Sequence, residues 1–350
     1  MKNLISIAFL FIFVLSCNSD ETNDVLPDTD NATLVVGYFP TWKENPPSPQ
    51  WDKITHLCLA FAFVQPDGSL DVEMALRHKN LIKPAHDNKV KVLLSVGGAY
   101  SWNFSAAILN PLLRNKLIDD IEKAIVDLNL DGVDIDFEEW DGGYDGASAN
   151  DLKKRDALEE TFKSLRQRLG NDKLIAAAVA ACNDNNGWGY YNCYNNTMHQ
   201  YLDFASLMIY DKTGPWPGSP VGPHSDWDFF EQAINHWLNN KKLPKEKLIA
   251  GVPFYGYSFK SSYSSEGAVD IAYSEILLKY PDDEPHLKDN VGLTYYDGMN
   301  TIKRKTEFVV NNHLKGIMIW ELTLDTDDQS KSLLNMIHNV IKPRVVSTLF

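Results

Sequence analysis

The sequence predicts an α/β protein with a (β/α)₈ or TIM barrel, and three observations support this fold. Short apolar segments alternate with segments of helical periodicity over about 300 residues. A row of carboxylates stands at the end of the fourth apolar segment, where such barrels build their active sites. No glycine-rich phosphate loop follows the first apolar segment, which disfavours the alternative of an open, doubly wound sheet.

The elements follow in chain order from these patterns. The expected strands are 34–39, 54–63, 91–96, 132–137, 173–179, 204–210, 248–254 and 316–320. Helical segments such as 112–128 and 151–169 carry apolar residues at three- and four-residue spacing. Segment 257–293 is rich in Ser, Asp and Pro, with one short helical pattern at 271–280. We expect it to form a short excursion on the barrel rim between strands seven and eight, too small for a separate domain.

The first 32 residues precede the predicted barrel and have a different composition. Residues 1–17 combine a positive start with a short apolar run, as in a signal peptide. Their end, VLSC, resembles the lipobox of bacterial lipoproteins, in which the cysteine, here Cys17, is diacylated after cleavage; the alternative is an ordinary signal peptide and a secreted protein. Residues 18–32 are polar and acidic and predict a flexible tether. We therefore expect a barrel at 33–350, lipid-anchored in the bacterial cell envelope, at the outer membrane or cell surface.

Charge and cysteine content exclude several classes of partner. The formal net charge of −14 argues against nucleic acid and anionic membrane surfaces as partners, so the lipid would be the sole membrane contact. Cys58 lies in an apolar run and is expected in the core. Cys182 and Cys193 flank a polar loop, where a disulfide is an open alternative in an oxidising compartment. No Cys/His spacing predicts a zinc site, and we expect neither a metal nor another cofactor.

The most informative stretch is the sequence DGVDIDFE at 131–138. Because side chains alternate along a strand, Asp134, Asp136 and Glu138 should point the same way, with roughly 6–7 Å between neighbours. Burial of several like charges is costly, so some of these carboxyls should hold protons. An idle acidic edge strand is the alternative, but the residues between the acids are apolar and would fill the other face. The row therefore predicts an active site.

Five separated motifs together resemble glycoside hydrolase family 18, the chitinase-like family. They are the DxxDxDxE sequence at 131–138, SVGG at 95–98, MIYD at 208–211, GVPFYG at 251–256 and GIMIWE at 316–321. The resemblance covers nearly all of residues 33–330, and the motifs come in the family's order. It implies a retaining hydrolase of β-1,4 bonds between N-acetylglucosamine units, and a glycan as partner.

The resemblance also implies roles for the catalytic residues. The family uses a substrate-assisted route, in which the acetamido oxygen of the sugar attacks C1 to form an oxazolinium ion. Glu138 would protonate the leaving oxygen and later activate water. Asp136 would stabilise the charged intermediate and share a proton with Asp134. Tyr210 would donate to the acetamido carbonyl, while Asp211 would support the sugar or the acid.

Further residues would bind the substrate. Trp320 would form the floor of the sugar site, Tyr38, Phe61 and Met208 its walls, and Gly98 would keep the strand exit open. Several aromatic residues in presumed loops are candidates for outer subsites, namely Trp42, Trp102, Trp188 and Trp216. Plain core packing is the alternative for Trp320, Phe61 and Met208, a tight strand exit for Gly98, and a structural hydrogen bond for Tyr210. His56 is expected to be a core histidine.

Three functions remain open at this point. The first is a chitinase or chitooligosaccharide hydrolase, expected to be a monomer and to cleave internally because segment 257–293 is short. The second is an endo-β-N-acetylglucosaminidase that cuts the chitobiose core of N-glycans. The third is a non-catalytic sugar-binding relative, disfavoured because the acid Glu138 is present. Glu139 and Trp140 follow the acid where Tyr-Pro is frequent in the family, so the leaving-group side should differ in shape.

Overall fold

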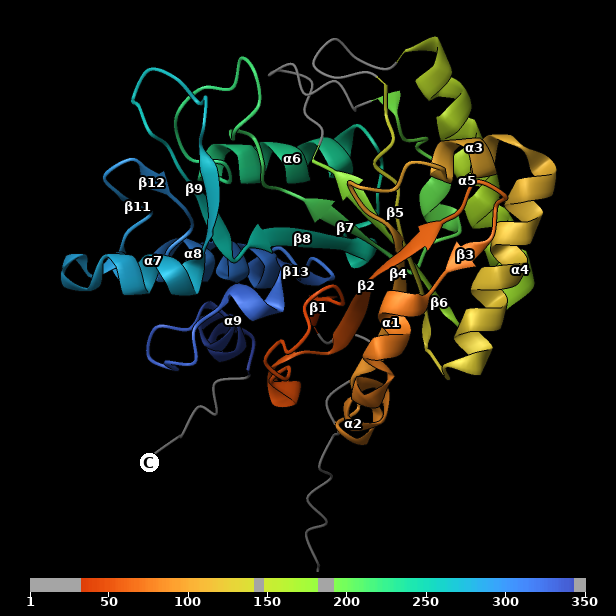
Figure 1. Cartoon of the computed structure of the whole chain (residues 1–350), viewed down its shortest axis with the longest axis horizontal. Helices are drawn as coiled ribbons and strands as arrows, with labels where there is room; N and C mark the ends of the chain where they lie inside the picture. The colour runs from red at the N-terminus through yellow and green to blue at the C-terminus, as the bar shows by residue number, and fades with distance from the viewer. Residues whose placement is uncertain (1–32, 142–147, 182–191, 343–350) are drawn as a thin grey trace, which may run out of the picture. The chain divides into compact units, whose positions relative to one another are not determined.

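A closed barrel of parallel strands forms the centre of the fold (Figure 1). The computed structural model describes residues 33–141, 148–181 and 192–342. Within these ranges, eight strands hydrogen-bond in parallel, and β1 closes the barrel by pairing with both β2 and β13. The strands are β1 (Leu34–Pro40), β2 (His56–Val64), β4 (Lys91–Gly97), β5 (Gly132–Asp136), β6 (Leu174–Ala180), β7 (Phe204–Met208), β8 (Leu248–Pro253) and β13 (Gly316–Trp320). The predicted (β/α)₈ barrel is confirmed.

The alternation of side chains along each strand separates two apolar clusters. In β5, Val133 and Ile135 point outward and are fully buried beneath the helices, where each contributes about 1.5–3 kcal/mol. Inward-facing residues of the other strands fill the barrel interior, among them Cys58, Phe204 and Met318. Asp134 and Asp136 have the same inward orientation as this interior cluster, so the acids sit inside the barrel.

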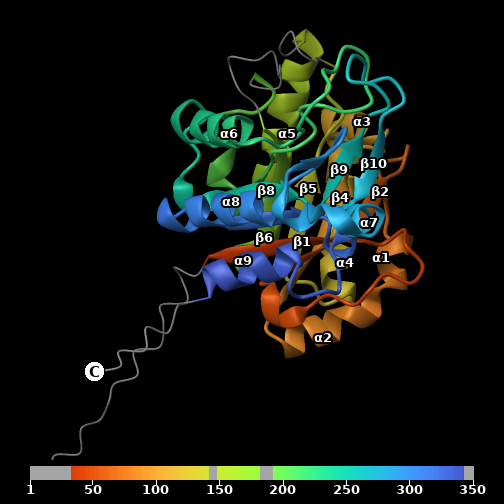
Figure 2. The same cartoon turned by 90° about the vertical axis from the view of Figure 1, so that its left-hand side faces the viewer.

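Helices cover the outside of the barrel. They are α1 (Glu73–Arg77), α2 (Ile82–Asp87), α3 (Phe104–Leu109), α4 (Pro111–Asp127), α5 (Ala149–Leu169), α6 (Trp227–Asn239), α8 (Met299–Asn311) and α9 (Leu333–Ile341). Side chains cap several of them: Asn110 accepts from the first turn of α4, Asp226 from that of α6, and Ser148 forms a capping box at α5. The perpendicular view shows α6, α8 and α9 along one side of the barrel (Figure 2).

Three strands end earlier than the sequence predicts, and one of them, predicted at 248–254, ends at Pro253. The strand predicted at 132–137 ends at Asp136, and the strand predicted at 204–210 ends at Met208. In β5 the last paired residue is Asp136, which lies opposite Gly97 of β4, and Gly97 has a φ of 118°, a conformation that favours glycine. Glu138 therefore lies two residues beyond its strand, in the loop region that a barrel uses for catalysis.

The rim segment contains more regular structure than the sequence predicts. Strands β9 (Tyr255–Ser258), β10 (Val269–Ala272), β11 (Asn290–Val291) and β12 (Thr294–Tyr295) form an antiparallel sheet, joined by α7 (Tyr273–Lys279). Only the helix was expected. Strands of two to four residues are too short to show a period of two in the sequence. A further short strand, β3 (Leu70–Asp71), pairs antiparallel with β2.

Several predictions fall on residues outside the described ranges. These are the signal peptide with Cys17, the tether at 18–32, and Cys182; Cys193, its expected partner, is buried. Lipidation and the disulfide therefore stay predictions. In the parts of the chain that the structure describes, none of the helices has the length and apolar character needed to cross a bilayer.

Candidate active site

Asp134 is held at the bottom of the site by two hydroxyl groups. Tyr38 on β1 donates to its Oδ2 atom at 2.8 Å, and Ser95 on β4 donates to the same atom at 2.7 Å. Burial raises the pKa of Asp134 to about 6, and the two hydrogen bonds limit that rise. The Oδ1 atoms of Asp134 and Asp136 are buried without a hydrogen-bond partner among the described residues. Among the described residues no hydrogen bond joins the two carboxyls, so the proton sharing expected from the sequence stays a prediction.

Asp136 and Glu138 also have raised pKa values. Burial is the main cause for Asp136, and the charges of Glu138 and Asp134 add to it. Glu138 is open to solvent on the cleft side, while protein groups surround the rest of its carboxyl. This loss of hydration, followed by the charge of Asp211, raises the pKa of Glu138 to about 7. A carboxyl that still holds its proton near neutral pH is suited to general acid catalysis.

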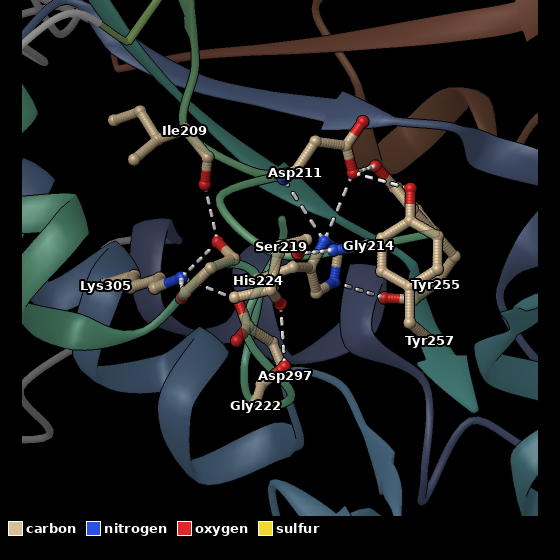
Figure 3. A network of polar contacts seen from close by, with 12 residues as sticks. Ile209, Asp211, Gly214, Ser219, Gly222, His224, Tyr255, Tyr257, Asp297 and Lys305 are labelled. Carbon is tan, nitrogen blue, oxygen red and sulfur yellow. Dashed lines mark hydrogen bonds and ion pairs between the residues drawn. The ribbon is translucent and has the colours of Figure 1, made fainter. Parts of the chain in front are cut away.

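The loop after β7 places Tyr210 and Asp211 beside Glu138. Tyr210 is buried, its hydroxyl lies 3.9 Å from the Sδ atom of Met318, and its ring faces Tyr255 edge-on. Asp211 has a φ of 63°, which is uncommon for a residue with a side chain. Its Oδ1 atom accepts hydrogen bonds from the hydroxyls of Tyr255 and Tyr257, as Figure 3 shows. The side chain of Asp211 remains 40% exposed.

An apolar hollow of about 370 Å³ opens on one side of Glu138. The Trp320 ring lies 5.5 Å from the Tyr38 ring and 5.7 Å from the Phe61 ring, measured between centroids. Trp42 stacks on Phe61 at 6.1 Å. Flat aromatic rings of this kind can pack against the apolar faces of sugars. The arrangement therefore places Trp320, Tyr38, Phe61 and one of the four candidate loop tryptophans together.

Gly98 makes this aromatic arrangement sterically feasible. It has a φ of 86°, and a Cβ atom added there would come within 2.7 Å of the Phe61 ring. Any larger residue would strain the backbone and displace the ring.

A second, smaller hollow of about 130 Å³ lies on the other side of Glu138. Its lining includes Met208, Tyr210, Asp211 and, after the acid, Trp140. Glu138 thus borders both hollows, as an acid that acts on a bond between two sugars must.

The residue after the acid fixes the loop that carries it. Both carboxylate oxygens of Glu139 accept backbone N–H groups at the start of α3, from Phe104 at 2.7 Å and Ser105 at 2.9 Å. The buried ammonium of Lys154 on α5 donates to the Glu139 carbonyl at 2.6 Å and also binds Asp141. The unusual Glu139 therefore ties the catalytic loop to α3 and α5.

A half-buried ion pair similarly joins the loop that carries Trp42 to the loop that follows Trp320. Lys43 lies 2.8 Å from the Oε1 atom of Glu321, which is only 3% exposed, and 2.6 Å from the Thr323 hydroxyl. These contacts hold the loop after β1 against the loop after β13.

The remaining residues singled out in the sequence lie outside these hollows or have a structural role. Trp102 is 76% exposed, and Trp216 packs against Tyr257 on the rim sheet. Trp188 lies outside the described residues. His56 is buried at the opposite end of the barrel, edge-on to Phe204, as expected of a core histidine.

Sequence reasoning missed several residues at the site. Tyr255 stands in the GVPFYG motif, so its position at a strand end was a usable signal. The roles of Tyr257, His224, Lys43 and Glu139 had no local signal, because each depends on a partner from another loop.

Comparison with known proteins agrees with this geometry. The sequence model of glycosyl hydrolases family 18 matches residues 34–325. A chitinase-like effector of Moniliophthora roreri is 30% identical over 274 residues, which cover 73% of this chain and 66% of the relative. Chitinase C of Streptomyces lividans is 26% identical over 363 residues, covering 84% of this chain and 58% of that enzyme. The chain therefore spans between 58% and 66% of the length of these two curated relatives.

Solved structures give the same result. A chitinase from Bacteroides thetaiotaomicron has a TM-score of 0.77 at 32% identity, covering 89% of this chain and 97% of that one. The family 18 chitinase from the chitin utilization locus of Flavobacterium johnsoniae has a TM-score of 0.72 at 29% identity, with 89% and 94% covered. With the match to the family model, these likenesses show that the chain belongs to glycosyl hydrolases family 18.

Proposed function

We propose that this protein hydrolyses β-1,4 bonds between N-acetylglucosamine units of chitin or chitooligosaccharides. The observation that carries the proposal is the position of Glu138, whose pKa is raised to about 7, between an aromatic hollow and the Tyr210–Asp211 loop. The relatives described above that are named chitinases support the substrate class. The presence of the acid argues against a role limited to binding.

The proposed mechanism is retaining and substrate-assisted. Asp134 and Asp136 are buried in the barrel behind Glu138, so neither is exposed to attack the anomeric carbon. The acetamido oxygen of the sugar bound on Trp320 would attack C1, while Glu138 gives its proton to the leaving oxygen. Asp136 would stabilise the positive oxazolinium, and Tyr210 would donate a hydrogen bond to the acetamido oxygen. Glu138, now a carboxylate, would take a proton from water as the water opens the ring at C1.

We further propose internal cleavage by a monomeric, lipid-anchored enzyme of the cell envelope. The rim sheet is formed by short strands, which supports a cleft open at both ends. Lipidation at Cys17 rests on the sequence alone. Replacement of Cys17 with Ala should abolish incorporation of labelled fatty acid and release the protein from the membrane fraction. Retention of the label in this variant would contradict the assignment.

The decisive experiment is mass spectrometry of two parallel digests. Chitin hexasaccharide and a high-mannose glycoprotein are incubated with the full chain, with Glu138→Gln as the matched inactive control. We expect short chitooligosaccharides from the hexasaccharide and no release of glycans. Release of glycans that leaves one N-acetylglucosamine on the glycoprotein would show that the enzyme is an endo-β-N-acetylglucosaminidase and not a chitinase. Inactivity of folded protein in both digests would favour the binding-only relative.

A further inference from the structure

A buried histidine lies directly behind Asp211 and has no role in the mechanism above. His224, in the loop between β7 and α6, is only 1% exposed. Its ring packs against Tyr255 and Tyr257, with centroid distances of 4.9 Å and 5.1 Å. Figure 3 shows the ring beneath the Asp211 carboxylate, on the side away from the free carboxylate oxygen.

The contacts of the ring define which nitrogen carries the proton. Nε2 lies 3.1 Å from the carbonyl oxygen of Tyr255. A carbonyl oxygen only accepts, so Nε2 must be the N–H donor. In the neutral ring, Nδ1 then has a free lone pair. The backbone N–H of Asp211 points at Nδ1 from 3.3 Å and donates to that lone pair.

The same Nδ1 atom is also 3.3 Å from Oδ1 of Asp211. A second proton on the ring would turn Nδ1 into a donor, which can bind the carboxylate but not the backbone N–H. Neutral His224 therefore holds Asp211 by its backbone, and cationic His224 holds it by its carboxylate. One proton decides between two ways of holding the same residue.

Charged and titratable groups face this ring from each element packed around it. They are Asp211 on the loop after β7, Tyr255 and Tyr257 on β9, Asp297 just before α8, and Lys305 within α8. Lys305 is fully buried, lies 2.6 Å from Asp297, and also donates to the hydroxyl and carbonyl of Ser225. Asp297 is near enough that the charge of His224 lowers its pKa, although burial raises that pKa overall. Because Lys305 compensates Asp297, Asp211 is the carboxylate left for His224 to pair with.

We propose that His224 is a positioning residue for Asp211, and that the proton on Nδ1 switches Asp211 between a backbone-held and a carboxylate-held state. The inference rests on the proposed function, in which Asp211 stands beside the acid Glu138. In the neutral state, the tyrosine hydroxyls alone bind the Oδ1 atom, and the charge of Asp211 keeps the proton on Glu138. In the cationic state, His224 offsets that charge, and the Asp211 N–H loses its acceptor.

Two substitutions separate positioning from a merely structural role. The Asn amide places a polar atom near the position of Nδ1, and the Gln amide places one near Nε2. His224→Asn should keep an acceptor for the Asp211 N–H but leave the Tyr255 carbonyl unpaired. His224→Gln should do the reverse. We therefore expect His224→Gln to lose kcat by about tenfold or more with little change in KM, because Asp211 is displaced.

The expected pattern for His224→Asn is the opposite. Its kcat should stay within about threefold of the parent, while its melting temperature falls further than that of His224→Gln, because a buried carbonyl lacks a donor. Both variants should lose one ionisation from the acidic limb of the kcat/KM profile. His56→Gln, a buried histidine at the far end of the barrel, serves as control and should change stability only. A parent-like kcat and pH profile in His224→Gln, or a loss of kcat that follows melting temperature across both variants, would overturn the proposal.

Nitrogen NMR of histidine-labelled full-length protein tests the switch without any substrate. The His224 signal is identified by its absence from the His224→Gln variant. In the neutral ring, this signal should show the Nε2–H tautomer. In Asp211→Asn, the doubly protonated ring should be less populated than in the parent at the same acidic pH, because the cation loses its carboxylate partner. An Nδ1–H tautomer of the neutral ring, or an equal population of the doubly protonated ring in the parent and in Asp211→Asn, would refute the switch. If the protein hydrolyses neither glycan, the proposed function fails while this measurement still decides on His224.

Discussion

Single carboxyl groups differ in protonation because their surroundings differ. Glu138 has few hydration partners on its protein side and faces the charge of Asp211, so its pKa is raised to about 7. Asp134 has a pKa of about 6, kept from rising further by the hydroxyls of Tyr38 and Ser95. At neutral pH, Glu138 therefore retains much of its proton, and the proton is available for transfer to a leaving group.

The dependence of kcat on pH should reflect the raised pKa of Glu138. A general acid must be protonated, so kcat should be high below the pKa of Glu138 and fall as the pH rises through about 7. Asp211→Asn removes a negative charge that raises this pKa, and we expect the basic limb of kcat to move to lower pH by about half a unit or more. The kcat profile is measured on chitin hexasaccharide. A basic limb that stays in place in a folded, active Asp211→Asn variant would exclude the coupling.

The same raised pKa should cost stability at alkaline pH. The folded protein binds the Glu138 proton more tightly than the unfolded chain does, so this contribution to stability is complete below pH 4.5 and is lost as the pH rises through about 7. Glu138→Gln removes the ionisation, and we expect it to be inactive but more stable than the parent at pH 8. Because solvent reaches Glu138, the gain should be about 1 kcal/mol rather than the full value for a buried group.

Urea unfolding at two pH values measures this effect. The difference between Glu138→Gln and the parent should be present at pH 8 and vanish near pH 4.5. An equal difference at both values would show a change in packing instead of the removal of a charge.

Elements of structure position the acid through the residue that follows it. Glu139 ties the loop after β5 to the first turn of α3, and Lys154 on α5 binds the Glu139 carbonyl. The carboxylate also sits at the positive end of the short helix α3. The catalytic loop is thus attached to two helices that pack on the outside of the barrel.

Loss of this attachment should affect both stability and catalysis. Glu139→Ala removes two charge-assisted hydrogen bonds, and we expect the free energy of unfolding to fall by about 1–2 kcal/mol, with kcat reduced as Glu138 loses its fixed position. Glu160→Ala on α5 is the matched control, since its ion pair with Lys163 is 44% exposed on the glutamate side and 43% on the lysine side. That control should change the free energy by less than about 0.5 kcal/mol. If Glu139→Ala left both the free energy of unfolding and kcat unchanged, Glu139 would not hold the catalytic loop in place.

At the scale of the whole molecule, ion pairs with at least one buried partner join different segments of the chain. Lys305 on α8 joins Asp297 and the loop at Ser225, and Lys43 joins the first loop of the barrel to Glu321 in the last.

Replacement of Lys305 tests how much one such pair contributes. Lys305→Met leaves Asp297 buried without a counterion, and we expect the free energy of unfolding to fall by about 3–5 kcal/mol. Adding Asp297→Asn should recover part of this loss, because the uncompensated charge is gone. Urea unfolding of both variants at pH 7 measures the difference. A double variant less stable than Lys305→Met would contradict a purely electrostatic origin.

The sequence by itself determined the barrel and the acidic row. Each strand carries its own period of two or its own apolar run, so β13 was predicted with its observed ends, and Asp134 and Asp136 with their side chains on the same face of the strand. The motifs extended this to Glu138, Tyr210, Asp211 and Trp320, since their spacing is local. Such features depend on neighbours within a few residues, and the chain itself displays them.

Only the tertiary structure decided what surrounds those residues. The Nδ1 of His224 contacts Asp211 13 positions earlier, its Nε2 contacts Tyr255 31 positions later, and Lys43 meets Glu321 across 278 positions. The rim sheet formed from strands too short to be recognised individually, and the end of β5 at Asp136 depends on where its pairing with β4 stops. A contact between distant loops follows from closure of the barrel, which brings strand ends together regardless of their separation along the chain, and no local pattern encodes it.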